Sequence, residues 1–194
     1  IIFNGDGYTD EWIEEAQRRG LLNLKSTVDA APHMLDPKNI ALFEEFGVLN
    51  EVENHSRYEV KLDTYSKLIN IEGQTMSHMT KRKIAPAVSA YAEQVAGTIN
   101  AKKQAAPDLQ PTADLKLLAQ LNDGANEISD ALEVLDAALE QAQATQDSLE
   151  KARSYHDGVL AAMERLRAAC DEMEGIVSTE AWPLPTYNKM LFYC

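Results

Sequence analysis

Apolar or large side chains recur at three- and four-residue spacing over most of residues 50–177, and this pattern constrains the fold most. Such spacing places the side chains along one face of a helix. The first stripe consists of Tyr58, Leu62, Tyr65, Ile69, Met76 and Met79. No run of alternating apolar and polar residues predicts a β-strand. The sequence therefore predicts an all-α protein.

Two breaks divide this region into three long helices. The stretch APDLQPTAD, with two prolines, predicts a linker after about residue 104. Near residue 145 the apolar spacing continues, so periodicity alone permits one very long helix. We favour a hairpin there, because Asp147 followed by Glu150 is typical of a helix start. Pro86 leaves two alternatives for residues 50–104, a continuous helix or one kinked at the proline.

Three helices with apolar stripes need one another to remove those stripes from water. We therefore expect residues 50–177 to form a long, antiparallel, coiled-coil-like bundle of three helices. Within residues 1–49, the sequence predicts short helices that begin after Thr9, near residue 26 and after Asp36. The first of these helices ends at Gly20 and the last at Gly47, and the middle one stops before Pro32.

Residues 178–194 form a third segment, rich in aromatic residues. Pro183 and Pro185 predict a non-helical tail, and its aromatic content predicts that the tail packs back on a surface. At the other end of the chain, the apolar residues Ile2 and Phe3 precede a glycine-rich turn. We expect these two residues to be poorly packed or buried against the tail, around Trp182 and Phe192.

The charge balance narrows the possible partners. Acidic residues outnumber basic ones by 31 to 18, for a net charge of −13. Nucleic acids and anionic membranes are bound through clustered lysine and arginine, so we expect neither partner. No apolar run approaches the length of a membrane span. Two widely spaced cysteines favour a reducing compartment, and Cys170 is predicted to be a buried, inert side chain.

No motif predicts a catalytic, cofactor-binding or metal site. The turn Asn4–Gly7 lacks the lysine and hydroxyl residue of a phosphate loop and the terminal glutamate of a calcium loop. The four histidines are scattered, and none belongs to a paired Glu-x-x-His motif. Five positions are instead candidates for interaction or structural roles: Glu72, His156, Trp182, Tyr187 and Phe192.

Two of these positions are polar residues within apolar stripes. Glu72 either finds a cation on another helix or domain, or lies where the bundle opens to water; we favour the second alternative. His156 falls between Ala152 and Val159, which predicts a buried, hydrogen-bonded histidine. The aromatic candidates Trp182, Tyr187 and Phe192 are predicted to dock the tail.

Four stretches carry a family resemblance: FNGDGYTDEWIEEAQRRGLLNLKSTVDA, NHSRYEVKLDTYSKLINIE, IAPAVSAY and WPLPTYNKMLFYC. In this order they resemble the C-terminal region of type III glutamine synthetases of bacteria. The resemblance implies a parent ligase that makes glutamine from glutamate and ammonia through γ-glutamyl phosphate. It implies ATP and Mg²⁺ or Mn²⁺ as cofactors of the parent and none for this chain. It also implies a catalytic domain elsewhere in the polypeptide, a homo-oligomer of six or more subunits, and a cytoplasmic location.

The resemblance brings no catalytic residue with it, because the reacting groups of the family belong to segments upstream of this region. We therefore expect a non-catalytic helical module that serves folding, oligomer contacts or regulation. One alternative is a regulator that binds the acidic surface near Glu72. Another is a free-standing helical adaptor or partner-binding protein.

Overall fold

The computed structural model describes residues 3–192, apart from the side chains of Tyr187 and Asn188. Every regular element in this range is a helix, so the prediction of an all-α fold is confirmed. The chain divides into two compact units, Ile1–Tyr65 and Ser66–Cys194, and the division falls inside a long helix.

The N-terminal unit begins with four short elements: α1 (Asp10–Arg18), α2 (Thr27–Ala30), the 3-10 helix η1 (Ala31–Leu35) and α3 (Pro37–Glu45). The predicted starts and ends largely hold. Gly20 and Gly47 follow α1 and α3 with φ of 73° and 62°, a left-handed conformation that glycine adopts without strain. The α-helix α2 ends before Pro32, as predicted, but the backbone continues directly into η1, because a proline fits the first turn of a helix.

Phe3 and Trp12 form a small aromatic contact in the N-terminal unit. Their ring centroids lie 4.9 Å apart, and the guanidinium carbon of Arg19 lies 5.8 Å from the Trp12 ring centroid. Phe3 is half-buried against its own neighbouring helix, an arrangement that we did not predict. Ile2, the other residue of that prediction, lies outside the described residues.

Hydrogen bonds from Arg18 and Arg19 lower the pKa of Glu15 to about 2.

Helix α4 (Glu51–Met79) begins with a reciprocal cap. The backbone N–H of Asn50 donates to the Glu53 carboxylate at 2.8 Å, and the N–H of Glu53 donates to Asn50 Oδ1 at 2.9 Å. Such a pair satisfies two backbone donors at a helix start that have no partner within the helix. The sequence therefore contains a strong start signal just where the long-helix pattern begins.

Pro86 does not end the long helix. A single π turn, η2 (Thr80–Ile84), joins α4 directly to α5 (Ala85–Ala105), so the helical backbone runs without interruption past the proline. Pro86 has no N–H to donate, and its ring crowds the carbonyl four residues earlier. The wider π turn, in which Ala85 donates to the Thr80 carbonyl, lies where that crowding occurs.

The hairpin near residue 145 is present. Helix α6 (Thr112–Ala144) ends there, and α7 (Ser148–Arg153), the π turn η3 (Ser154–Val159) and α8 (Leu160–Glu174) follow. The Asp147 carboxylate accepts the N–H groups of Leu149 and Glu150 at 3.1 and 2.9 Å, as an N-cap should. The Glu150 side chain does not complete a capping box but bonds to Arg153 at 2.7 Å.

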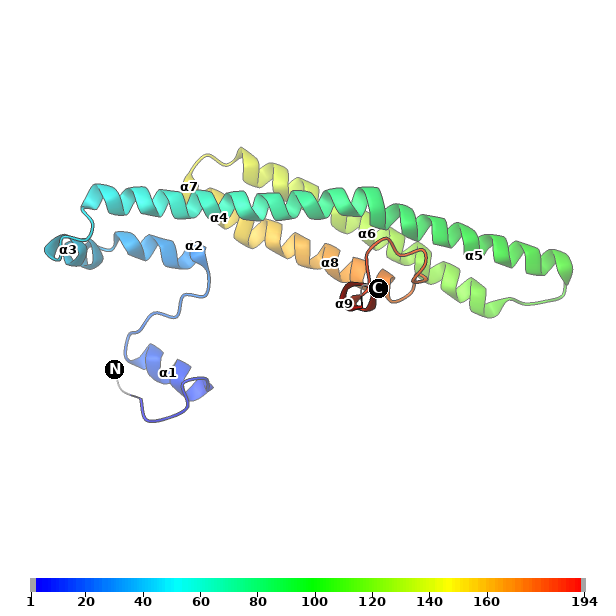
Figure 1. Ribbon diagram of the computed structural model, residues 1–194, viewed down its shortest axis with the longest axis horizontal. Coiled ribbons are helices and arrows are strands. Elements are labelled where there is room, and N and C mark those ends of the chain that lie inside the picture. The colour runs from blue at the N-terminus through cyan, green and yellow to red at the C-terminus, as the bar shows by residue number, and fades with distance from the viewer. Residues whose placement is uncertain (1–2, 193–194) are drawn as a thin grey trace. The chain divides into compact units, whose positions relative to one another are not determined.

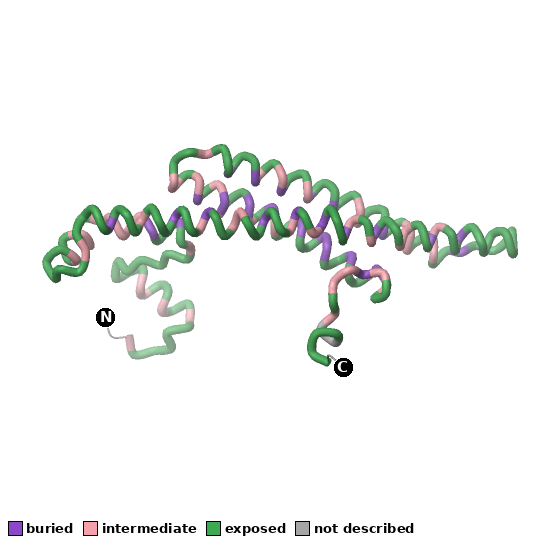
Figure 2. The backbone as a smooth tube through the Cα atoms, turned by 45° about the horizontal axis from the view of Figure 1, so that its top comes forward, coloured by how far each residue is buried: buried purple, intermediate pink, exposed green. Residues whose placement is uncertain are grey.

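Within the second unit, α6 is antiparallel to the helices on either side of it (Figure 1). Pairs along α4, α5 and α6 give the direction, because one residue number rises as the other falls: Asn70–Gln143, Ser77–Asp136 and Lys102–Asp114. On the other side, Arg165 of α8 reaches Glu127 of α6 at 2.8 Å and lowers the pKa of that carboxyl. Buried residues recur along each of these helices (Figure 2).

Small and polar side chains form much of the buried face of α4 and η2. Gly73, Ser77 and Thr80 are buried, whereas Met76 and Met79 of the predicted stripe are only half-buried. A Cβ atom at Gly73 would lie 3.0 Å from a Leu139 methyl group and 3.2 Å from a Val159 methyl group. The helix backbones approach too closely at this point for large side chains. The stripe predicted from apolar periodicity therefore lies beside the residues that make the contact.

The C-terminal tail contains one helical turn, α9 (Tyr187–Leu191), so the prediction of a wholly non-helical tail was wrong. Both prolines precede this turn and do not interfere with it. Thr186 begins it, since its hydroxyl accepts the Lys189 N–H at 3.3 Å and its carbonyl accepts the Met190 N–H at 3.1 Å. The Trp182 side chain of the tail is buried, with 6% of its surface exposed.

The close contact at Gly73 predicts a destabilising variant. Gly73→Leu should lower the free energy of unfolding by roughly 1–3 kcal/mol, because the new side chain must displace Leu139 and Val159. Urea-induced unfolding followed by far-UV circular dichroism measures the change.

Gly97→Leu is the matched control, because a Cβ atom there meets nothing within 4 Å. It should raise the free energy of unfolding by about 0.5–1 kcal/mol through better helix propensity. Equal effects of the two substitutions would contradict the proposed close packing at Gly73.

Candidate functional site

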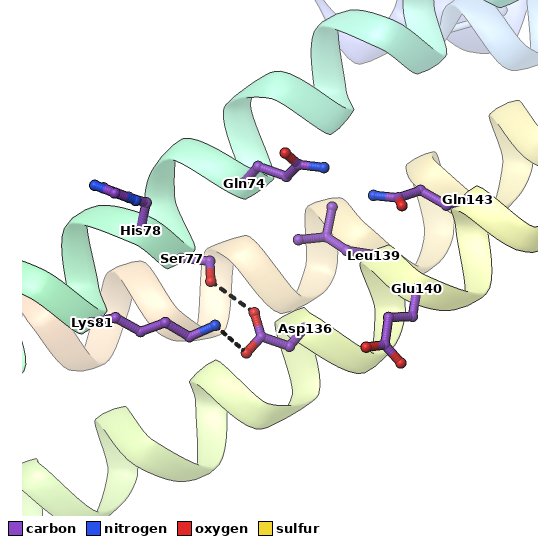
Figure 3. A pocket seen from close by; sticks show the side chains of 8 residues that line it. All are labelled: Gln74, Ser77, His78, Lys81, Asp136, Leu139, Glu140 and Gln143. Carbon is purple, nitrogen blue, oxygen red and sulfur yellow. Dashed lines mark hydrogen bonds and ion pairs between the residues drawn. The ribbon is translucent and has the colours of Figure 1, made fainter.

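Two hollows in the second unit gather polar or mixed side chains. The first lies between α4, η2 and α6 (Figure 3), with a volume of about 390 Å³. The Ser77 hydroxyl donates to Asp136 Oδ1 at 2.7 Å, and Lys81 Nζ lies 2.6 Å from Asp136 Oδ2. Ser77 is buried, while Lys81 and Asp136 are half-exposed. The Asp136 carboxylate thus bonds to residues on two successive turns of the neighbouring helix.

The surroundings of this cluster suit a structural clamp better than a reaction centre. Figure 3 shows His78 pointing away from Asp136, so no imidazole base faces the Ser77 hydroxyl. The Asp136 carboxylate, which accepts the hydrogen bond from Ser77, already pairs with the positive charge of Lys81. Gln74, Glu140 and Gln143 complete an open wall. The arrangement can fix the axial register of two helices.

The second hollow is a groove of about 520 Å³ between α4, α8 and the tail. Its lining is largely apolar and includes four methionines: Met76, Met79, Met163 and Met190. Methionine side chains adapt to irregular partners, and grooves of this volume suit bound groups of moderate size. We call this hollow the methionine groove.

Polar groups lie at both the floor and the rim of the methionine groove. Trp182 lines it, and the buried indole N–H has no hydrogen-bond partner among the described residues, which leave out the side chains of Tyr187 and Asn188. At the rim, Arg167 pairs with Asp171 at 3.1 Å, and Glu72 and Glu174 add two further carboxylates. Glu72 is exposed, so its carboxylate is solvated, although the helices approach closely at the adjacent Gly73.

Cys170 lies on the α8 side of the groove and is buried, as predicted. Burial raises the pKa of its thiol, which keeps the sulfur protonated at neutral pH and weakens it as a nucleophile. Cys194 lies outside the described residues. The structure therefore supports a packing role for Cys170.

His156 is not buried, and that prediction was wrong. Its side chain is 36% exposed and contacts Asp157 at 2.7 Å, while the adjacent Tyr155 is 3% exposed. Tyr155 lies three residues after Ala152 and four before Val159, so it occupies the contact position of the heptad. Desolvation raises the pKa of the Tyr155 hydroxyl.

The remaining aromatic candidates differ. Trp182 is buried, whereas Phe192 is 70% exposed. Tyr187 begins α9, and its side chain is not among those described. Of the candidate residues, Glu72 and Trp182 come together in one hollow, and His156 does not line it. The sequence analysis missed Ser77, Lys81 and Asp136; opposite charges on helices expected to be antiparallel were the available signal.

Metal ligands do not converge in the described structure. Among residues 3–192, no three His, Cys, Asp or Glu side chains form a group that could hold a metal ion. Across the same residues, no helix combines the length and low charge that a membrane span requires.

The family model for the glutamine synthetase C-terminal domain matches residues 1–103. The chain belongs to the glutamine synthetase C-terminal domain family. Similarity to whole proteins covers 99% of the chain and therefore extends well beyond residue 103.

Three curated relatives match 99% of the chain over 27% of their own length. A glutamine synthetase from Butyrivibrio fibrisolvens is 37% identical over 192 residues. A type-3 glutamine synthetase from Dictyostelium discoideum is 32% identical over 196 residues, and a glutamine synthetase from Bacteroides fragilis (strain YCH46) is 29% identical over 196 residues. The chain thus spans about a quarter of the length of the curated relatives it matches, and it corresponds to a C-terminal part of them.

The Ser77–Asp136 hydrogen bond predicts a measurable coupling. In a double-mutant cycle with Ser77→Ala and Asp136→Ala, the two side chains should couple by roughly 1 kcal/mol, because Ser77 is buried and its partner is charged. The same cycle for Lys81→Ala and Asp136→Ala should give about 0–1 kcal/mol and fall with added salt. The opposite order would show that the ion pair holds the helices.

Trp182 should anchor the tail through its apolar surface. Trp182→Ala should lower the free energy of unfolding by about 3–5 kcal/mol, as expected for a buried aromatic side chain. Trp182→Phe should cost much less, because the N–H that it removes has no acceptor. Phe192→Ala, at an exposed position of the same tail, is the control and should change stability by less than about 0.5 kcal/mol.

Proposed function

We propose that this chain is the C-terminal helical module of a glutamine synthetase and that it serves folding and subunit assembly without contributing reacting groups. The observation that carries the proposal is the match of 99% of the chain to a C-terminal part of three glutamine synthetases. The whole enzyme would join ammonia to glutamate at the expense of ATP, through γ-glutamyl phosphate. Its catalytic part would lie outside these 194 residues.

ATP and Mg²⁺ or Mn²⁺ would bind in that catalytic part. The metal would stabilise the transferring phosphoryl group there. The side chains of residues 3–192 do not fit such a site, since their carboxylates and imidazoles form no cluster of metal ligands. The proposal therefore routes no chemical step through this module.

Exposed apolar side chains in the N-terminal unit support a docking role. Tyr8 is 100% exposed, and Phe46 and Val52 are 71% and 77% exposed. Large apolar side chains exposed to this degree can pack against another part of a protein. We propose that the catalytic part covers this unit, within a homo-oligomer of six or more subunits.

The remaining parts of the proposal concern location and partners. We propose a cytoplasmic enzyme that binds neither nucleic acid nor membranes. The net charge of −13 supports the absence of anionic partners, because phosphate-rich surfaces attract basic proteins.

Removing the helical module tests the proposal. In the complete enzyme, deletion of residues 50–177 should lower the number of subunits per oligomer, as calculated from the mass measured by analytical ultracentrifugation. Glutamine formation should fall as a consequence. The isolated chain should form no glutamine from glutamate, ammonia and ATP. An intact oligomer with unchanged kinetics after the deletion would refute the assembly role.

A pair of point variants separates docking from general misfolding. Phe46→Ser should weaken assembly of the complete enzyme yet leave the stability of the isolated chain within about 0.5 kcal/mol, because the residue is exposed there. Glu45→Ser alters the neighbouring exposed position and should leave assembly unchanged.

A further inference from the structure

The methionine groove is an apolar surface that the described chain leaves open. All the residues that line it belong to the second unit. Half-buried methionines line it from two sides, Met76 and Met79 on α4 and Met163 on α8. On the tail side, Met190 is 54% exposed, and the next two residues, Leu191 and Phe192, are 72% and 70% exposed.

The charges at the rim indicate what the occupant carries. Arg167 is matched by Asp171, whereas Glu72 and Glu174 have no cation within ion-pair distance among the described residues. A second copy of the same acidic groove would bring like charges together, which costs free energy. An apolar segment with lysine or arginine beside it would instead match both the lining and the rim.

The Trp182 side chain adds a polar requirement. Its indole N–H is buried without an acceptor in the described part of the chain, and an unpaired buried donor costs stability. A peptide segment offers backbone carbonyl groups along its whole length, so a small shift of the indole would give the donor a partner. A purely hydrocarbon ligand would leave it unpaired.

The length of the relatives indicates the source of the segment. About three quarters of each relative lies outside the matched region, and in such a protein that part is covalently attached to the groove. Attachment raises the effective concentration of a segment far above that of a separate protein.

We propose that the methionine groove binds an apolar, basic-flanked segment of the same polypeptide, from the part of the enzyme that precedes this domain. This inference rests on the proposed function, because it requires the remainder of a glutamine synthetase. It deepens that function by identifying a second contact, on the helical module itself, and the chemistry that recognises it.

Methionine oxidation tests the proposal in the complete enzyme. Hydrogen peroxide oxidises exposed methionines, and mass spectrometry reports the rate at each one. Met79 and Met190 should oxidise roughly tenfold more slowly in the complete enzyme than in the isolated chain. Met173, which is 1% exposed in the chain, is the internal reference and should be slow in both.

Charge reversal at the rim tests the basic flank. In the complete enzyme, the double variant Glu72→Lys and Glu174→Lys should restore rapid oxidation of Met190. The control is Glu133→Lys with Glu164→Lys, which reverses two exposed carboxylates outside the groove and should leave Met190 protected.

Three results would overturn the inference. Rapid oxidation of Met79 and Met190 in the complete enzyme would show an open groove. Protection in the isolated chain at high concentration would identify a second copy as the occupant. Protection that rim reversal leaves intact would exclude a basic flank. Each result is read at the methionines, so the groove can fail while deletion of residues 50–177 still disrupts assembly.

Discussion

The close approach of α4 to α6 and η3 at Gly73 is the constraint on which the second unit depends. A glycine at this point lets the methyl groups of Leu139 and Val159 lie where a side chain would otherwise begin. One helical turn later, Ser77 bonds to Asp136, and Lys81 pairs with the same carboxylate. Apolar contacts alone allow helices to slide along one another, whereas a hydrogen bond from a buried hydroxyl forms at only one position of one helix along the other. Together these contacts fix how far apart the helices lie and which residues face each other.

That constraint explains which parts of the fold the sequence predicted. Helix existence and class followed from periodicity, and most boundaries followed from local signals such as Gly20, Gly47 and Asp147. The contact face of α4 did not follow, because Ser66, Gly73 and Ser77 carry no apolar signal and are buried by proximity. The same limit applied at His156, where two adjacent residues both fitted the stripe and only the packing selected Tyr155.

The candidate sites were predicted less well, for a related physical reason. Glu72 and Trp182 belong to segments about 110 residues apart, and only the fold brings them to one groove. Asp136 lies on a partly exposed helix face, yet its carboxylate bonds to Ser77 and Lys81 of the neighbouring helix. A carboxylate at the edge of an interface can be solvated on one side and bonded on the other. Apolar periodicity indicates which face of a helix is buried. It does not show whether a polar residue at the edge of that face makes contacts across the interface.

The π turn at Thr80–Ile84 has a consequence for how this helix can change in length. A π turn holds more residues than an α-helical turn, so loss of one residue there can be absorbed by conversion to regular α-helix. Elsewhere in α4 or α5, losing one residue would rotate everything beyond it by about 100° and turn the contact face away from α6. Natural length variation in the first long helix should therefore concentrate at these five residues.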